Sequence, residues 1–158
     1  MENKTIFRTN PQKASARVAI NSFMVGSIFV ILSIIWSLNP KAFPQIITIQ
    51  LVMAIPFLYI SSLAYAKIGY WNETKLWDGF GWFTNNLGNG FILNAIGLMV
   101  ATINMPVALL YFGITIALML IYSLINLVDA PYLFREKMFK FLIFLVILFL
   151  GGILPLII

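Results

Sequence analysis

The chain has 158 residues, of which 61% are hydrophobic and only 9% are charged, and its formal net charge is +5. A soluble domain is about half apolar and about a quarter charged, so this composition excludes a soluble globular protein. The chain contains no cysteine and no histidine, which excludes disulfides, thiolate catalysis, sulfur ligation of metals, haem ligation and the usual proton carrier at neutral pH.

Long runs without charged residues locate the membrane spans that the sequence predicts, because a charge at the bilayer centre costs at least about 2.5 kcal/mol. Four such runs occur, and the third, from Gly79 to Val128, is too long for one crossing of about 30 Å. Pro106 divides it, because proline lacks a backbone amide and disfavours helix in the residue before it. We therefore expect five spans, at about 18–38, 45–66, 87–104, 106–128 and 139–158.

Residues 1–17 form a basic tail before the first span. Asn10 is a helix-capping residue type and Pro11 suits the first helical position, so we expect a helix to start there and run into the first span. Lys13 and Arg17 would share one face of it, where they set topology and contact anionic head groups, with specific lipid or protein docking as the alternative. The first apolar run ends without a small-x-small site, so we expect it to remain as a span rather than be cleaved.

An aromatic segment, residues 70–83, separates the second and third spans and holds Trp71, Trp77 and Trp82. Rings with an apolar body and a polar edge settle at the level of the head groups. Apolar residues recur here at helical spacing, namely Leu76, Phe80, Phe83 and Leu87. We therefore expect a short interfacial helix with the three tryptophans as anchors, and a gate or docking surface is the alternative.

The polar residues of the predicted spans are amides and hydroxyls. Asn21, Asn94 and Asn126 each fall within about two turns of the cytoplasmic ends of their predicted spans, so we expect them at one depth. Interhelical adhesion is one interpretation, since such hydrogen bonds average about 0.6 kcal/mol. The alternative is an inward-facing polar vestibule for a small ligand or a lipid head group, with Gln50 as its counterpart on the outer side.

Two further features concern packing and movement. Pro56 lies at the middle of the second span, where it removes a helical hydrogen bond, and we consider it a candidate hinge. Pairs of small residues four apart allow helices to approach closely. They are Ser22 and Gly26, Ser62 and Ala66, Gly97 and Ala101, and Gly113 and Ala117.

The positions of the basic residues predict the topology, because lysine and arginine in short loops stay in the cytoplasm. With five spans and a cytoplasmic amino terminus, nine of the ten basic residues lie inside and only Lys41 lies outside. With four spans, Arg135, Lys137 and Lys140 would move outside and weaken the asymmetry. We therefore expect the carboxyl terminus outside.

The chain shows no known catalytic motif. Three acids, Glu73, Asp78 and Asp129, are the candidates for converging on a metal. Phosphate loops, nucleophile elbows and zinc-helix motifs are absent from the sequence. The predicted spans lack the acid or histidine that proton-coupled transport usually needs. We therefore expect no enzymatic activity, no metal, no cofactor and no nucleic-acid partner.

The sequence thus predicts an all-α polytopic membrane protein, a single domain over residues 18–158 made of five transmembrane helices and one short interfacial helix. Two functions remain open. The first is a non-enzymatic subunit or scaffold of a membrane complex, whose partners are lipids and another membrane protein or further copies of the chain. The second is a small uncoupled carrier, channel component or lipid-binding protein that uses the asparagine vestibule.

Overall fold

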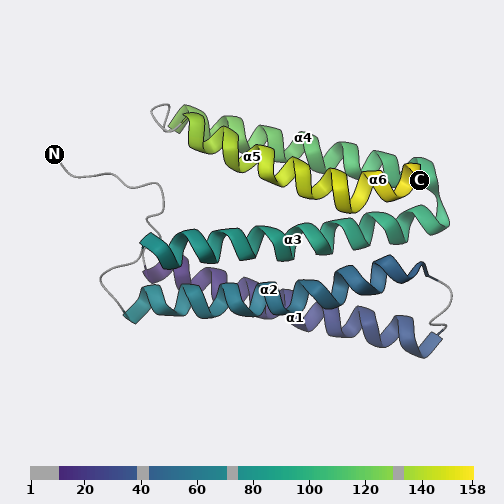
Figure 1. Cartoon of the computed structure of the whole chain (residues 1–158), viewed down its shortest axis with the longest axis horizontal. Helices are drawn as coiled ribbons and strands as arrows, with labels where there is room; N and C mark the ends of the chain where they lie inside the picture. The colour runs from purple at the N-terminus through teal and green to yellow at the C-terminus, as the bar shows by residue number, and fades with distance from the viewer. Residues whose placement is uncertain (1–10, 39–42, 71–74, 130–133) are drawn as a thin grey trace. The chain divides into compact units, whose positions relative to one another are not determined.

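The computed structural model describes residues 11–38, 43–70, 75–129 and 134–158, and the regular structure in them is helical (Figure 1). Five helical segments in these residues are long and apolar enough to cross a membrane. They are α1 (Pro11–Leu38), α2 (Gln45–Tyr70), α3 (Lys75–Ile103), α4 (Met105–Asp129), and α5 (Phe134–Leu148) continued by the π-helix η2 (Phe149–Ile153) and by α6 (Leu154–Ile157). The five apolar helices confirm the predicted number and are consistent with an integral membrane protein.

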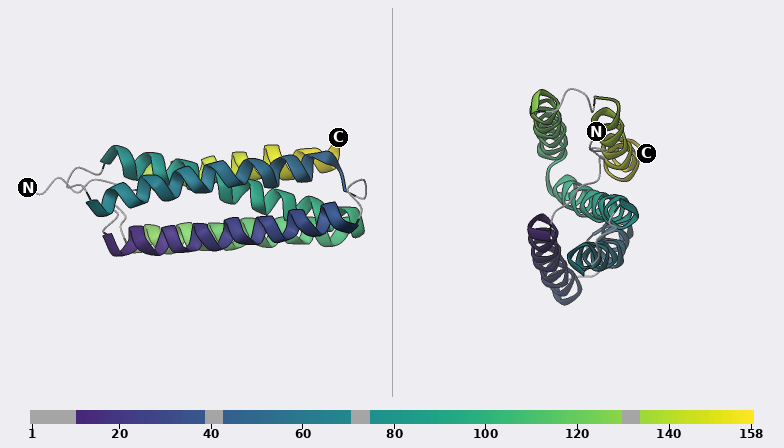
Figure 2. Two further views of the ribbon diagram at one scale, coloured as in Figure 1. Left: turned by 90° about the horizontal axis from the view of Figure 1, so that it is seen from below. Right: turned by 90° about the vertical axis from the view of Figure 1, so that its left-hand side faces the viewer.

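The chain divides after Ile92 into two compact units. In the first unit α1 lies alongside α2, as Figures 1 and 2 both show. Most buried residues of α2 recur three and four positions apart: Ile47, Leu51, Ala54, Leu58, Ser61, Tyr65 and Ile68, with Gln50 and Ala64 buried beside them. Those of α1 follow a similar spacing: Ala14, Asn21, Ile28, Leu32 and Ile35. Such spacing is typical of helices that pack at a shallow angle with interlocking side chains.

The start of α3 differs from the sequence prediction. We expected a separate interfacial helix and a third span from about Leu87, but α3 is continuous from Lys75 to Ile103. The glycines that suggested a break are contact points with α2: a Cβ on Gly81 would lie 3.2 Å from Ala64 Cβ, and one on Gly88 would lie 2.7 Å from Leu58 Cγ. Close approach of the two backbones offsets the low helix propensity of glycine, about 1 kcal/mol per residue.

The turn between α3 and α4 is where the sequence predicted it. Asn104 separates the two helices, and its Oδ1 accepts a hydrogen bond of 3.2 Å from the backbone N–H of Val107. This is an N-cap, which satisfies one of the amides left over at the start of α4. Pro106, at the second position of α4, needs no amide partner there.

The second unit contains the end of α3, then α4, α5, η2 and α6. Helices α4 and α5 lie side by side (Figures 1 and 2). Their shared core consists of Phe112, Phe144 and Leu148. The Phe112 ring fills the space above two glycines, since a Cβ would lie 2.2 Å from it on Gly97 and 2.6 Å from it on Gly152.

Candidate functional site

A cluster of polar side chains joins the three helices of the first unit, and we call Arg17, Tyr65 and Asp78 the Arg17 cluster. The guanidinium of Arg17, on α1, donates a hydrogen bond of 2.5 Å to the Tyr65 hydroxyl on α2. Its carbon atom lies 4.8 Å from the centre of the Tyr65 ring. Its Nη1 also lies 3.9 Å from Oδ1 of Asp78 on α3. One cation therefore contacts a carboxylate, a hydroxyl and an aromatic face.

The Arg17 cluster is largely buried. Asp78 is 2% exposed and Tyr65 is 1% exposed, whereas the Arg17 side chain remains 38% exposed. Next to it, Ser61 Oγ donates to the Gly81 carbonyl at 2.9 Å, so α2 and α3 are also joined by a hydrogen bond. The arrangement holds the helix ends together and leaves Arg17 with one accessible side.

Sequence reasoning missed Asp78 as a buried residue. We placed it in a surface segment, because the third span was expected to begin near Leu87. The available signal was the spacing of small residues on α3: Gly81, Thr84 and Gly88 are buried three and four apart, and Asp78 lies three residues before them on the same face.

Two of the four predicted ligand-binding residues lie in the first unit. Asn21 is buried, and its Nδ2 donates to the Leu58 carbonyl of α2 at 3.5 Å. Gln50 is also buried, on α2. The Asn21 contact is of the adhesive kind, a long hydrogen bond between two neighbouring helices.

Asn94 and Asn126 belong to the second unit, which does not bring them together. The Nδ2 of Asn94 donates to the Ile147 carbonyl of α5 at 3.0 Å, whereas the Nδ2 of Asn126 donates to Tyr122 of its own helix at 2.8 Å. Asn126 lies about 12 residues further from the turn at Asn104 than Asn94 does, or about 18 Å along the helices. Asn94 and Asn126 therefore do not lie side by side in the second unit. Asn21 belongs to the first unit, and the common depth of the three asparagines stays a prediction.

Asn94 lies against the π-helix η2. In η2 the N–H of Leu154 donates to the Phe149 carbonyl, five residues earlier. Pro155 favours this change from the α-helical to the π-helical hydrogen-bond spacing, because it has no amide to continue the α-helical pattern. Gly151 and Gly152 let the Asn94 carboxamide approach, since a Cβ on Gly151 would lie 2.2 Å from its Nδ2. Asn94 is fully buried, and within the described residues its Oδ1 accepts no hydrogen bond.

The predicted hinge and the described anchors lie at exposed or half-buried positions of α2 and α3. Pro56 is exposed inside the continuous helix α2, and its hinge role stays a prediction. Trp77 is exposed and Trp82 is half-buried, both in the first turns of α3. Trp71 lies outside the described residues.

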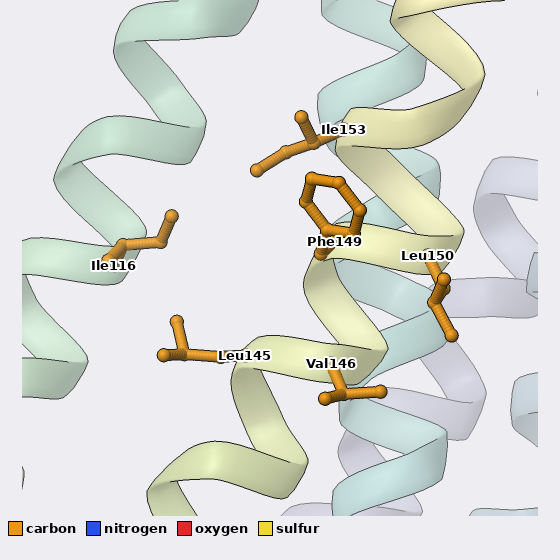
Figure 3. Close-up of a pocket in the computed structure, with 6 residues that line it drawn as sticks. All are labelled: Ile116, Leu145, Val146, Phe149, Leu150 and Ile153. Carbon is orange, nitrogen blue, oxygen red and sulfur yellow. The ribbon is translucent and has the colours of Figure 1, made fainter.

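One apolar pocket in the second unit has a volume of about 380 Å³. Its lining consists of hydrocarbon side chains from α4, α5 and η2: Ile116, Leu145, Val146, Phe149, Leu150 and Ile153. Figure 3 shows Ile116 facing Leu145, Phe149 and Ile153 across the gap between the helices. An apolar group suits this pocket, because a polar one would lose its hydrogen bonds there.

Metal chemistry has no support in the described ranges, where no three acidic side chains gather as a metal site requires. Of the three acids considered from the sequence, Glu73 lies outside these ranges. Comparisons with known proteins found no matching family model, no matching curated protein and no matching solved structure. A functional proposal therefore rests on the residues of the chain itself.

Proposed function

We propose that the chain is an integral membrane protein, without enzymatic activity of its own, that serves as a subunit or scaffold of a membrane complex. Its amino terminus would be cytoplasmic and its carboxyl terminus outside. The observation that carries this proposal is a row of exposed residues on α4, which we call the α4 stripe. It consists of Leu110, Gly113, Ala117, Leu120 and Leu124.

The α4 stripe has the composition of a helix-packing surface. Its members alternate three and four positions apart, so they share one face, and Gly113 and Ala117 are at its centre. In lipid, helices associate through close packing rather than through the hydrophobic effect, and small residues permit that packing. A surface of this kind accommodates the helix of a partner protein or of a second copy.

Comparison of the glycines within the second unit supports this interpretation. Gly97 and Gly152 are already covered by Phe112, whereas a Cβ on Gly113 would meet nothing within 4 Å. The chain thus uses glycine for close packing inside the unit and leaves one glycine of the α4 stripe open. We assign the open surface at Gly113 to a partner helix.

The alternative, a small uncoupled carrier or channel component, has less support. Asn21, Asn94 and Asn126 donate their amide hydrogens to backbone carbonyls. Asn94 and Asn126 also lie too far apart along the helices to line one vestibule. The contacts of Asn21 and Asn94 join neighbouring helices and favour the adhesive role over a polar vestibule, whereas that of Asn126 lies within α4.

The test compares the assembly state of the wild-type chain with that of a variant carrying Gly113→Leu and Ala117→Leu. The two added side chains would keep a partner helix away, so we expect the wild type to be extracted as a defined assembly and the variant to lose it at least tenfold. Native mass spectrometry of protein in mild detergent measures the assembly, and cross-linking in the membrane before extraction detects contacts that detergent breaks.

Leu118→Phe provides a matched control, because Leu118 is exposed on α4 but lies outside the α4 stripe. It should leave the assembly unchanged. A wild-type chain that is monomeric both in the membrane and in detergent contradicts the proposal, and so does an assembly that survives both leucine substitutions.

A further inference from the structure

The apolar pocket of the second unit lies at one end of a longer row of residues that runs along α5 into the first residue of η2. Leu145 and Phe149 line the pocket. Leu142, Met138 and Arg135 continue toward the start of the helix on the same face, three or four residues apart. We call these five residues the α5 stripe. Arg135, Met138, Leu142 and Phe149 are all exposed.

The α5 stripe changes from charged to apolar along its length. Arg135 is at the polar end. In the sequence, the next two turns contain two further basic residues, Lys137 and Lys140, and one acidic residue, Glu136. From Met138 onward the stripe contains only apolar side chains. A ligand that follows it meets a cation first and hydrocarbon afterwards.

The dimensions of the α5 stripe fit a phospholipid. Leu145 is about 15 Å and Phe149 about 21 Å from Arg135 along the axis, at 1.5 Å per residue. One leaflet of a bilayer contributes about half of a hydrocarbon core of about 30 Å. With the arginine at the head-group level, the pocket therefore lies where the end of an acyl chain reaches. A cavity of about 150 Å³ with similar lining holds benzene, so about 380 Å³ has room for a chain end.

We propose that the α5 stripe binds one anionic phospholipid, with its phosphate on Arg135 and one acyl chain along Met138 and Leu142 into the pocket. The guanidinium forms paired hydrogen bonds with phosphate oxygens. The preference for an anionic lipid comes from net charge, because the choline cation of phosphatidylcholine offsets the charge of its phosphate and is repelled by the arginine. The chain end moves from one hydrocarbon environment to another, so the pocket contributes shape rather than a hydrophobic driving force. The site uses residues other than the α4 stripe. A negative result for lipid binding therefore leaves the proposed assembly untouched, and the reverse also holds.

The experiment measures lipid retention by the full chain in detergent, by native mass spectrometry during stepwise delipidation. The probes are phosphatidylglycerol and phosphatidylcholine with the same long acyl chains, and a short-chain phosphatidylglycerol. We expect the wild type to retain long-chain phosphatidylglycerol about fivefold better than phosphatidylcholine, the effect of about one surface cation on an anionic lipid. It should also retain the long-chain form better than the short-chain form.

Two variants separate the charge from the pocket. Arg135→Gln should abolish the preference for phosphatidylglycerol, whereas Lys67→Gln, at an exposed lysine of α2, should preserve it. Val146→Trp fills the pocket from an exposed position and should abolish the preference for long chains. Equal retention of the two head groups by the wild type overturns the proposal without any variant. A preference that survives Arg135→Gln, or a long-chain preference that survives Val146→Trp, overturns it as well.

Discussion

Arg17 and Asp78 form an ion pair in which the carboxylate is almost fully buried and the guanidinium is partly exposed. Removing two charges from water is costly, and their attraction compensates only when further hydrogen bonds are present. Tyr65 supplies one of these bonds from α2. The pair connects α1 with α3, and Tyr65 adds α2. The loss of either charge removes an ion-pair partner from the other.

We expect Asp78→Asn to lower the free energy of unfolding by about 2 kcal/mol. Breaking a buried pair costs about 3 to 5 kcal/mol, and the 38% exposure of the Arg17 side chain reduces this figure through solvent screening. Thermal unfolding in detergent, followed by circular dichroism, measures the change. Lys67→Gln is the control, as an exposed basic residue of the same unit.

A double-mutant cycle decides whether the two charges act on one another. Arg17→Gln combined with Asp78→Asn should cost clearly less than the sum of the single changes, because the second substitution removes a charge that has already lost its partner. Additive losses would show that each residue acts alone, which would contradict the role of the pair.

At the scale of the helices, the sequence predicted the number of apolar segments and the break at Asn104 and Pro106. Both follow from local chemistry, namely the run length of uncharged residues and the missing amide of proline. The start of α3 could not be predicted in this way. Gly81 and Gly88 weaken an isolated helix, and only their contacts with Ala64 and Leu58 show why the helix continues through them.

The candidate site was harder to predict than the helices. The sequence identified Asn21 and Asn94 as polar residues within spans, and both prove to be buried donors to a neighbouring helix. Their partners are backbone carbonyls, which every residue carries, so no sequence pattern marks them. The π-helix η2 was not predicted. Gly151, Gly152 and Pro155 are residues that weaken a regular α-helix, but they do not specify a π-helix.

The two asparagines of the second unit allow a matched test at this scale. Asn94→Leu removes the hydrogen bond between α3 and α5, and we expect it to lower the free energy of unfolding by about 1 kcal/mol, within the measured range for such bonds. Asn126→Leu removes only a bond within α4, and we expect almost no change. Chemical or thermal unfolding of both variants measures the difference. Equal effects would show that the bond to Ile147 contributes nothing to stability.

For the whole molecule, the number of apolar helices and the positions of the basic residues predict the membrane topology. The five helices of the described residues are long and apolar enough to cross a membrane, which is consistent with an integral membrane protein. If all five helices cross the membrane, the two termini lie on opposite sides, and the positions of the basic residues predict which side is cytoplasmic. A four-span arrangement would leave α3 out, although α3 is continuous and carries contacts with α2 along its first turns.

Cysteine tagging tests this topology directly, because the chain has no cysteine of its own and each introduced thiol is the single target. Thr5→Cys should be protected from a membrane-impermeant maleimide in intact cells, since it belongs to the side with nine of the ten basic residues. Lys41→Cys and Ile158→Cys should both react, because one and five crossings separate them from the amino terminus. Permeabilised cells provide the control, in which all three positions should react. If Ile158→Cys were protected while Lys41→Cys reacted, the number of crossings would be even, and one of the five apolar helices would not span the membrane.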